Sequence, residues 1–278
     1  MLGESALWDA ESGRLLWVDI LSGLIFARDL VGGPIASLQL DCTVGAVALR
    51  ESGGLIAATG RGLLTCDVDT GVVTTLAEIE PERAGNRMND GAVDPAGRFW
   101  FGSMDLAEVD GTGALYNRTP DGRVRKVLDS IICSNGPAWS PDGTTMYHVD
   151  SGRRLITAYE FDVACGQVGA GRIFVDDTSS PWFPDGVTVD AEGYVWNCKW
   201  DGGLLVRYAP DGSIDRALKV PVPRPTRCAF VGPELDQMAI TSARVGLTDP
   251  QLEQAPLSGR VLLTEPGVRG LPASRHAG

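Results

Sequence analysis

The 278-residue chain contains only two histidines, His148 and His276, and this scarcity excludes several classes of enzyme. A histidine-rich zinc site needs more imidazoles than the chain has, and a Ser-His-Asp triad is nearly excluded because His276 lies in the polar segment "PASRHAG". The GxSxG, GxGxxG and GxxxxGK[ST] patterns, which position a catalytic serine, a dinucleotide or a nucleotide phosphate, are also absent. Serine-hydrolase and nucleotide-dependent chemistry are therefore not expected.

Basic charge and long apolar runs are also scarce. The chain has 24 Lys and Arg against 36 Asp and Glu, a net charge of −12. Such a surface repels phosphate backbones, so no nucleic-acid partner is expected. No apolar run approaches the roughly 20 residues of a membrane-spanning helix, and the first residues lack the basic and apolar regions of an export signal. We therefore expect a cytoplasmic protein without a membrane partner.

The six cysteines stand apart from one another, with no CxxC pair and no metal-knuckle spacing. Because no export signal is visible, we expect reduced thiols buried mostly in strands, and a disulfide remains the alternative. The stretch "CDVDTG" at 66–71 resembles the start of an EF-hand loop, but no Glu follows at the required distance, so a hairpin turn is predicted.

A repeat dominates the rest of the sequence. Two short apolar runs around a turn such as "DPAG", "SPDG" or "DAEG" form a β-hairpin signal. It occurs six times at separations of 41 to 50 residues, and a second hairpin signal follows each copy. About four strands in each such unit is typical of a β-propeller blade, whereas a β-sandwich would not repeat at this spacing. The sequence predicts an all-β, six-bladed propeller over residues 1–272, followed by a short polar tail at 273–278.

The repeat also predicts which residues meet around the central channel. When the copies are aligned, their first positions are Glu4, Gly45, Asn89, Asn135, Asp185 and Arg227. We expect these positions at one mouth of the channel. Carboxylate and amide oxygens suit one divalent cation, and two close carboxylates would repel each other without a cation between them. The alternative is that these polar residues cap strand ends and bind channel water.

Four segments resemble the SMP-30/gluconolactonase (regucalcin-like) family in order and spacing: "GESALWD", "NRMNDGAVDPAGRFWFGSM", "SNGPAWSPDGTTMYHVDS" and "PDGVTVDAEGYVW". The resemblance covers nearly the whole chain. It implies a six-bladed propeller with one catalytic divalent metal at the channel mouth. The ligands of the family fall on Glu4, Asn135 and Asp185, and its substrate-contacting Arg and Asn fall on Arg87 and Asn89.

Two features of the chain depart from the family pattern. Similar proteins have more residues before the Glu ligand, so closure of the last blade and the rigidity of Glu4 are open questions. The loop "LAEVDGTG" at 106–113 differs from the regucalcin loop in which an acidic residue touches substrate. Glu108 is the candidate carried over for that contact, with Asp105 as its rival.

The function predicted from these features is metal-dependent hydrolysis of a sugar lactone, an aldonolactone such as gluconolactone or xylonolactone. Asp185 is the expected general base as well as a ligand, while Arg87 and Asn89 donate hydrogen bonds to substrate. The sequence does not determine whether the metal is calcium, magnesium, manganese, zinc or iron(II). It also does not determine which lactone is hydrolysed or the oligomeric state. Two alternatives are an aryl-ester or organophosphate hydrolase, compatible with Trp182 and Phe183, and a non-catalytic binding propeller.

Several of these residues have simpler interpretations. Arg87 could pair with Glu82 or Asp90 on the surface. Asp90 precedes a glycine and is expected to form a turn. His148 and Asp150 lie late in the second strand of their unit, away from the predicted metal ring, and are expected to be structural or to support the ligands without touching the metal.

Overall fold

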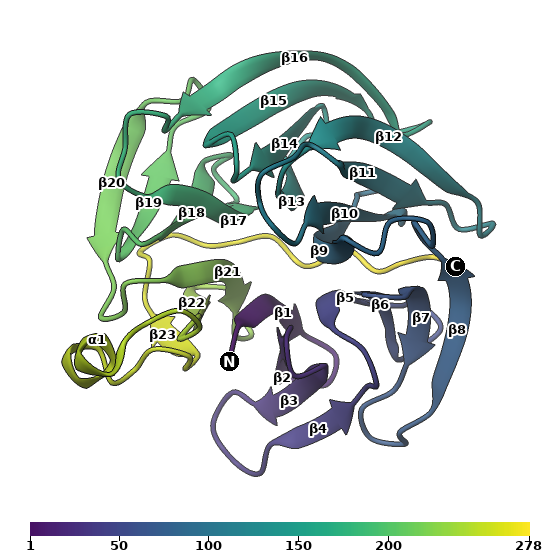
Figure 1. The fold of residues 1–278 in the computed structure, drawn as a ribbon, viewed down its shortest axis with the longest axis horizontal. Helices are drawn as coiled ribbons and strands as arrows, with labels where there is room; N and C mark the ends of the chain where they lie inside the picture. Colours follow the sequence, from purple (N-terminus) through teal and green to yellow (C-terminus); the bar gives the residue numbers. More distant parts are fainter.

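The computed structural model describes residues 1–278 as six β-sheets arranged in a ring around a central channel (Figure 1). Five sheets have four antiparallel strands and the sixth has three. The prediction of an all-β, six-bladed propeller is thus confirmed. The one helix has six residues, and no helix is long and apolar enough to cross a membrane.

Within each blade the strands follow chain order from the channel outward. Blade 1 comprises β1 (Gly3–Asp9), β2 (Arg14–Asp19), β3 (Leu24–Asp29) and β4 (Ala36–Gln39); blade 2 comprises β5 (Val44–Leu49), β6 (Leu55–Thr59), β7 (Gly62–Cys66) and β8 (Val73–Glu78); blade 3 comprises β9 (Asn86–Val93), β10 (Phe99–Asp105), β11 (Gly113–Arg118) and β12 (Val124–Ile131). Blade 4 comprises β13 (Ser134–Trp139), β14 (Thr145–Asp150), β15 (Leu155–Asp162) and β16 (Gln167–Asp176); blade 5 comprises β17 (Phe183–Val189), β18 (Val195–Trp200), β19 (Leu204–Tyr208) and β20 (Ile214–Lys219); blade 6 comprises β21 (Pro225–Val231), β22 (Gln237–Ser242) and β23 (Leu262–Thr264), with helix α1 (Asp249–Gln254) between β22 and β23.

The repeated turns have a structural cause that is visible in blades 3 and 5. Asp94 accepts hydrogen bonds from two backbone N–H groups of its own turn, and its second oxygen accepts from Trp100 Nε1 at 2.8 Å and from Arg98. Asp190 holds its turn in the same way and accepts from Trp196 Nε1 at 2.9 Å. Each aspartate therefore ties the hairpin turn to a fully buried tryptophan of the next strand, which explains the Asp and Trp of the repeat.

Apolar side chains fill the spaces between neighbouring blades. Trp100 of blade 3 packs edge-on against Trp139 and Phe161 of blade 4, with ring centroids 6.0 and 5.6 Å apart. Each blade buries its faces only against its neighbours, so the blades are parts of one folding unit. All six cysteines are free and four are buried, as expected for reduced thiols.

The ring closes although few residues precede β1. Leu2 pairs with Ala243 after β22, and the carbonyl of Met1 accepts from Arg244 N at 3.1 Å. Strand β1 also lies against β21, where the Thr226 hydroxyl donates to the Gly3 carbonyl at 2.6 Å. Blade 6 thus has three strands instead of four, and backbone pairing with the first residues of the chain joins it to blade 1.

The C-terminal residues cross the channel at one end. We call residues 269–278 the C-terminal strap; it runs from blade 6 to blades 2 and 3 (Figure 1, yellow). At its start, Gly270 N donates to Leu235 O at 2.8 Å, and near its end His276 N donates to Leu49 O at 2.8 Å. The predicted boundary between the propeller and a tail after residue 272 stays a prediction. Residues 273–278, expected to be a polar tail, pack on the propeller.

His276 anchors the strap. It is fully buried; its Nδ1 donates to the Gly97 carbonyl at 2.8 Å, and Arg118 donates to its Nε2 at 2.6 Å. We expect His276→Ala to lower the free energy of unfolding by about 2–4 kcal/mol, because it leaves a cavity and unpaired buried groups. Urea denaturation at pH 7.5 measures this loss, with His276→Gln as the smaller-change control. An unchanged midpoint for His276→Ala would contradict the anchoring role.

Candidate metal and substrate site

Each innermost strand breaks its pairing register close to one mouth of the channel. The breaks lie between Glu4 and Leu7, Val44 and Ala46, Met88 and Gly91, Asn135 and Ala138, Pro184 and Val187, and Pro225 and Cys228. Such β-bulges turn side chains out of the regular alternation of a strand and are frequent beside binding sites. Glu4, Asn89, Asn135 and Asp185 lie in or beside these bulges and reach a common pocket.

Two glycines lie at or next to the aligned positions because neighbouring inner strands approach closely there. A Cβ on Gly186, next to Asp185, would lie 2.7 Å from the Thr226 carbonyl oxygen. A Cβ on Gly45 would lie 2.1 Å from the Asn89 carbonyl oxygen. Larger residues at these positions would push the inner strands apart, which accounts for Gly186 after Asp185 and for Gly45 at the aligned position of blade 2.

The pocket has a volume of about 140 Å³ and brings together the six residues that the sequence analysis named as candidate metal ligands or substrate contacts. These are Glu4, Arg87, Asn89, Glu108, Asn135 and Asp185. Asp105, the rival of Glu108, is absent from the lining; its carboxylate instead accepts from three backbone N–H groups of the 106–110 loop. The structure thus supports the placement of the six side chains, while their roles stay predictions.

Glu4 and Asp185 are buried carboxylates without a cationic hydrogen-bond partner. Burial, and next the charge of Asp90, raises the pKa of Glu4 to about 8. Burial, and next the charge of Glu4, raises the pKa of Asp185 well above its ordinary value. Glu4 Oε2 accepts a hydrogen bond from Ser5 N at 2.9 Å, which offsets little of this repulsion. Buried carboxylates that repel each other in this way fit a divalent cation, which would hold both in the ionised form.

The third donor is the amide of Asn135. Its Nδ2 donates to Ser151 Oγ at 2.8 Å, so its Oδ1 is the atom available to a cation in the pocket. Oδ1 also accepts from Asn89 Nδ2 at 3.2 Å. An amide oxygen has a second lone pair available for a cation. No group of three or more His, Cys, Asp and Glu side chains with metal-binding geometry occurs in the structure. The donor set is therefore two carboxylates and an amide, all oxygen, which suits a hard cation.

Arg87 lies in the wall of the pocket and not on the surface. It is 8% exposed, and its Nη1 donates to Asn89 Oδ1 at 2.7 Å and to the Met88 carbonyl at 3.0 Å. The alternative pairing with Glu82 or Asp90 does not occur. Its other N–H groups have no hydrogen-bond partner in the protein, so they can bind oxygens of a molecule in the pocket.

The expectation for Asp90 was wrong. It belongs to strand β9, is 2% exposed, and its carboxylate accepts from Gly91 N, from Gly136 N at 2.8 Å and from Arg227 Nη1. Asp90 therefore forms a buried ion pair inside the channel and holds the backbone next to Asn135. A glycine after an aspartate marks a turn only where the chain reverses, and here it marks close packing.

Arg227 was also expected at this mouth, and it lies elsewhere. In β17 pairing resumes at Val187, two residues after Asp185, but in β21 it resumes at Cys228, directly after Arg227. The two residues thus hold different positions in their bulges, although they are equally far from the hairpin ends. Arg227 lines a separate, larger cavity of the channel, and Gly45 lines neither.

Sequence reasoning found only part of an aromatic rim. Phe183 and Trp200 pair across β17 and β18 and both line the pocket. Arg154 stacks over Phe183 at 4.1 Å and Arg224 over Trp200 at 4.8 Å, which fixes both rings. The sequence analysis named Trp182 and Phe183 as compatible with an aryl-ester pocket; Phe183 lines the pocket and Trp182 does not, and nothing in the sequence placed Trp200 near Phe183.

A thiol also borders the candidate ligands. Cys133 Sγ lies 3.7 Å from the Nδ2 atoms of both Asn89 and Asn135. His148 and Asp150 are structural as expected: His148 Nε2 bonds Ser134 Oγ at 2.9 Å, and Asp150 accepts from the backbone ahead of β13. Only the proximity of Cys133 to the "SNG" motif could have indicated its position.

Together, the ring of blades and the oxygen donors at one channel mouth define a six-bladed propeller with a candidate cation site. The chain belongs to the SMP-30/gluconolactonase/LRE-like family, whose model matches residues 2–244.

The chain is 35% identical to regucalcin of Gallus gallus over 285 residues, covering 100% of this chain and 95% of that protein. A calcium-binding regucalcin from Agrobacterium tumefaciens str. C58 has a similar structure, with a TM-score of 0.94, 33% identity and coverage of 99% of this chain and 93% of that one. A luciferin-regenerating enzyme gives a TM-score of 0.91 at 28% identity, with coverage of 99% and 94%.

Proposed function

We propose that the protein is a divalent-metal-dependent lactonase that hydrolyses an aldonolactone to the sugar acid. The observation that carries the proposal is the convergence of two buried, mutually repelling carboxylates and one amide oxygen in the pocket that also contains the guanidinium of Arg87. Membership of the SMP-30/gluconolactonase family supports the same reaction.

Glu4, Asn135 and Asp185 would hold the metal ion. A bound divalent ion would supply Lewis-acid polarisation of the lactone carbonyl and acidify water. Oxygen-only donors favour calcium, magnesium or manganese, and zinc and iron(II) remain candidates. Calcium is the first ion to test, because the similar Agrobacterium protein is described as calcium-binding.

The other roles in the reaction, substrate binding and proton transfer, fall to side chains of the pocket. Arg87 donates hydrogen bonds to substrate oxygens and fixes the sugar ring, while Glu108 accepts from substrate hydroxyls. Asn89 Nδ2 already donates to the Ser134 carbonyl at 2.9 Å and to Asn135 Oδ1 at 3.2 Å, so Asn89 donates to substrate by exchanging one of these bonds. Asp185 takes a proton from the attacking water as the new C–O bond forms at the carbonyl carbon. The ring C–O bond then breaks, and the proton passes from Asp185 to the departing ring oxygen, which becomes a hydroxyl of the sugar acid. A lactone is already an activated ester, so no covalent nucleophile is needed.

One observation favours a second candidate. Phe183 and Trp200 at the rim suit an apolar or aromatic leaving group, as in hydrolysis of an aryl ester or organophosphate on the same donor set. A non-catalytic binding propeller is the third possibility. Turnover of each substrate class distinguishes these functions directly.

The test is acid release, followed by pH-stat with correction for spontaneous hydrolysis. Glucono-δ-lactone, xylonolactone, phenyl acetate and an aryl phosphotriester are supplied to chelated protein, with calcium, magnesium, manganese, zinc and iron(II) added back one at a time. We expect metal-restored turnover of a lactone above that of the aryl esters. Metal binding without turnover of any substrate would favour the binding propeller instead.

A further inference from the structure

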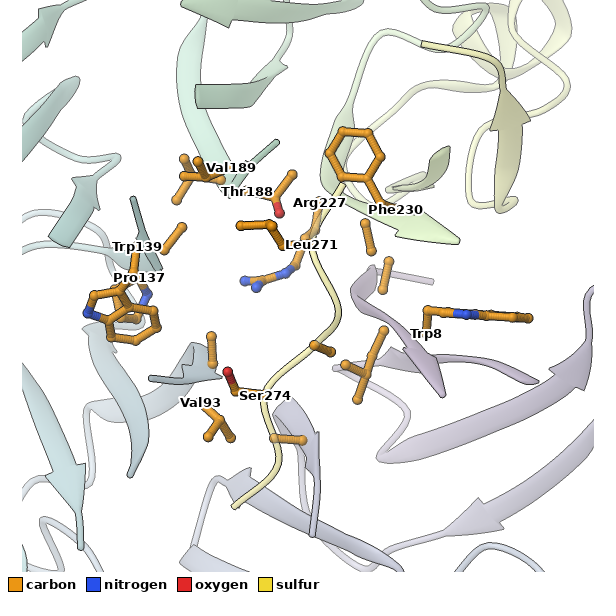
Figure 2. A pocket seen from close by; sticks show the side chains of 18 of the residues that line it. Trp8, Val93, Pro137, Trp139, Thr188, Val189, Arg227, Phe230, Leu271 and Ser274 are labelled. Atoms are coloured by element: carbon orange, nitrogen blue, oxygen red, sulfur yellow. The ribbon is translucent and has the colours of Figure 1, made fainter. Parts of the chain in front are cut away.

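A second cavity occupies the channel at the end crossed by the C-terminal strap. It measures about 540 Å³ and is lined by all six innermost strands together with strap residues 271–274 (Figure 2). Sixteen of its 26 lining residues are hydrophobic, with Trp8, Val93, Trp139, Val189, Phe230 and Leu271 among them. This volume and lining fall in the range of small-molecule sites.

Arg227 is the only charged residue in this lining. Arg227 is 9% exposed, and its guanidinium projects into the cavity among the apolar walls (Figure 2). Nη1 donates to Asp90, which lies deeper in the channel, and no protein group accepts from Nε or Nη2. Two N–H donors of a buried guanidinium are therefore available to a ligand in a mostly apolar space that has no other charge.

We propose that this cavity binds a small apolar monocarboxylic acid, with its carboxylate on Arg227 Nε and Nη2 and its hydrocarbon part against the apolar walls. The fork of two parallel N–H donors matches a carboxylate. Asp90 already offsets part of the guanidinium charge, so one negative charge is accommodated better than the two of a phosphate monoester. Leu271 of the strap lines the cavity and is 40% exposed, so the strap does not pack this side chain tightly against the inner strands.

This site is separate from the proposed catalytic mouth. The two pockets have no lining residue in common, and the Asp90–Arg227 ion pair lies between them. The inference therefore does not depend on lactone hydrolysis, and its test needs no turnover.

Octanoate is the probe, measured by isothermal titration calorimetry with the full chain at pH 7.5. We expect saturable one-to-one binding. 1-Octanol, which has the same tail without the charge, and acetate, which has the charge without the tail, should each bind at least about tenfold more weakly. Equal binding of octanol would show that Arg227 contributes nothing, and absence of octanoate binding would overturn the proposal.

Variants locate the bound octanoate. Arg227→Lys keeps the charge beside Asp90 but removes the planar fork, and should weaken octanoate roughly tenfold. Thr188→Phe fills the cavity and should abolish binding, whereas Thr188→Val keeps the volume and should leave it unchanged (Figure 2). Ser274→Trp, on the strap, replaces Thr188→Phe if that variant does not fold.

Arg87→Met, at the opposite mouth, should bind octanoate like the unmodified protein. Loss of binding in Arg87→Met with no change in Arg227→Lys would place the acid at the other mouth and refute the site.

Discussion

Asp185→Asn is expected to lower kcat/KM for glucono-δ-lactone by about a thousandfold or more while the propeller stays folded. Asp185 is buried in the pocket with Glu4 and Asn135, and the proposal makes it both a ligand and the acceptor of the proton from water. Asparagine has nearly the same shape but cannot accept that proton, and it withdraws one of the two negative charges offered to the cation. The measurement is pH-stat turnover at saturating metal, with circular dichroism to verify folding.

Asp211→Asn is the matched control for this variant. Asp211 belongs to the same blade, is exposed, and bonds only to Ser213 of its own turn. Its activity should equal that of the unmodified protein. If folded Asp185→Asn retained more than about a tenth of the activity, Asp185 could not be the base, and the assignment would pass to another group.

Metal binding is expected to have a large effect on stability that depends on pH. Burial and neighbouring carboxylates raise the pKa of Glu4 to about 8 and raise that of Asp185 in the same direction. A carboxyl group with a raised pKa in the folded state stabilises the fold fully below its unfolded value near 4.5, and this contribution is lost as the pH rises through about 8. The Tm of chelated protein should therefore fall between pH 5 and pH 8.

Added metal should reverse that loss. A ligand at a thousandfold excess over its Kd stabilises a one-site protein by about 4 kcal/mol, which corresponds to a Tm increase of roughly 8–16 °C for a chain of this size. Differential scanning calorimetry with calcium at pH 8 gives the value. Glu4→Gln removes one repelling charge, so its chelated form should melt higher than the unmodified protein at pH 8 and gain little from metal. An equal metal-induced shift in Glu4→Gln would exclude Glu4 as a ligand.

The sequence predicted the position of a site residue correctly where the number of residues between that residue and the next hairpin turn decides its position. Glu4, Asn89, Asn135 and Asp185 share one distance from a hairpin turn, and a closed ring converts equal distances along separate strands into one level of a channel. Arg227 has the same spacing but a different place in its bulge, and the side-chain direction inside a bulge depends on which residue resumes pairing. The same limit explains the error at Asp90, because burial depends on neighbouring strands that local composition does not reveal.

The pairing that forms the aromatic rim and the packing of the strap were beyond sequence reasoning for a related reason. Phe183 and Trp200 become neighbours through strand pairing, and each is fixed by an arginine from another loop. Residues 273–278 look like a polar tail because their partners, Leu49, Gly97 and Arg118, lie far away in sequence. A single buried histidine among polar residues gives no periodic signal that would predict its anchoring.

By itself the sequence determined the number of blades, their order and the oxygen-donor set near one mouth, because these follow from a repeat period and from residue types at fixed offsets. Only the tertiary structure decided which way Arg227 points, that Asp90 is its buried partner, and that the strap lies over a second, apolar cavity. These features arise from contacts between strands of different blades, whose geometry is set by bulges and close packing after the ring has closed.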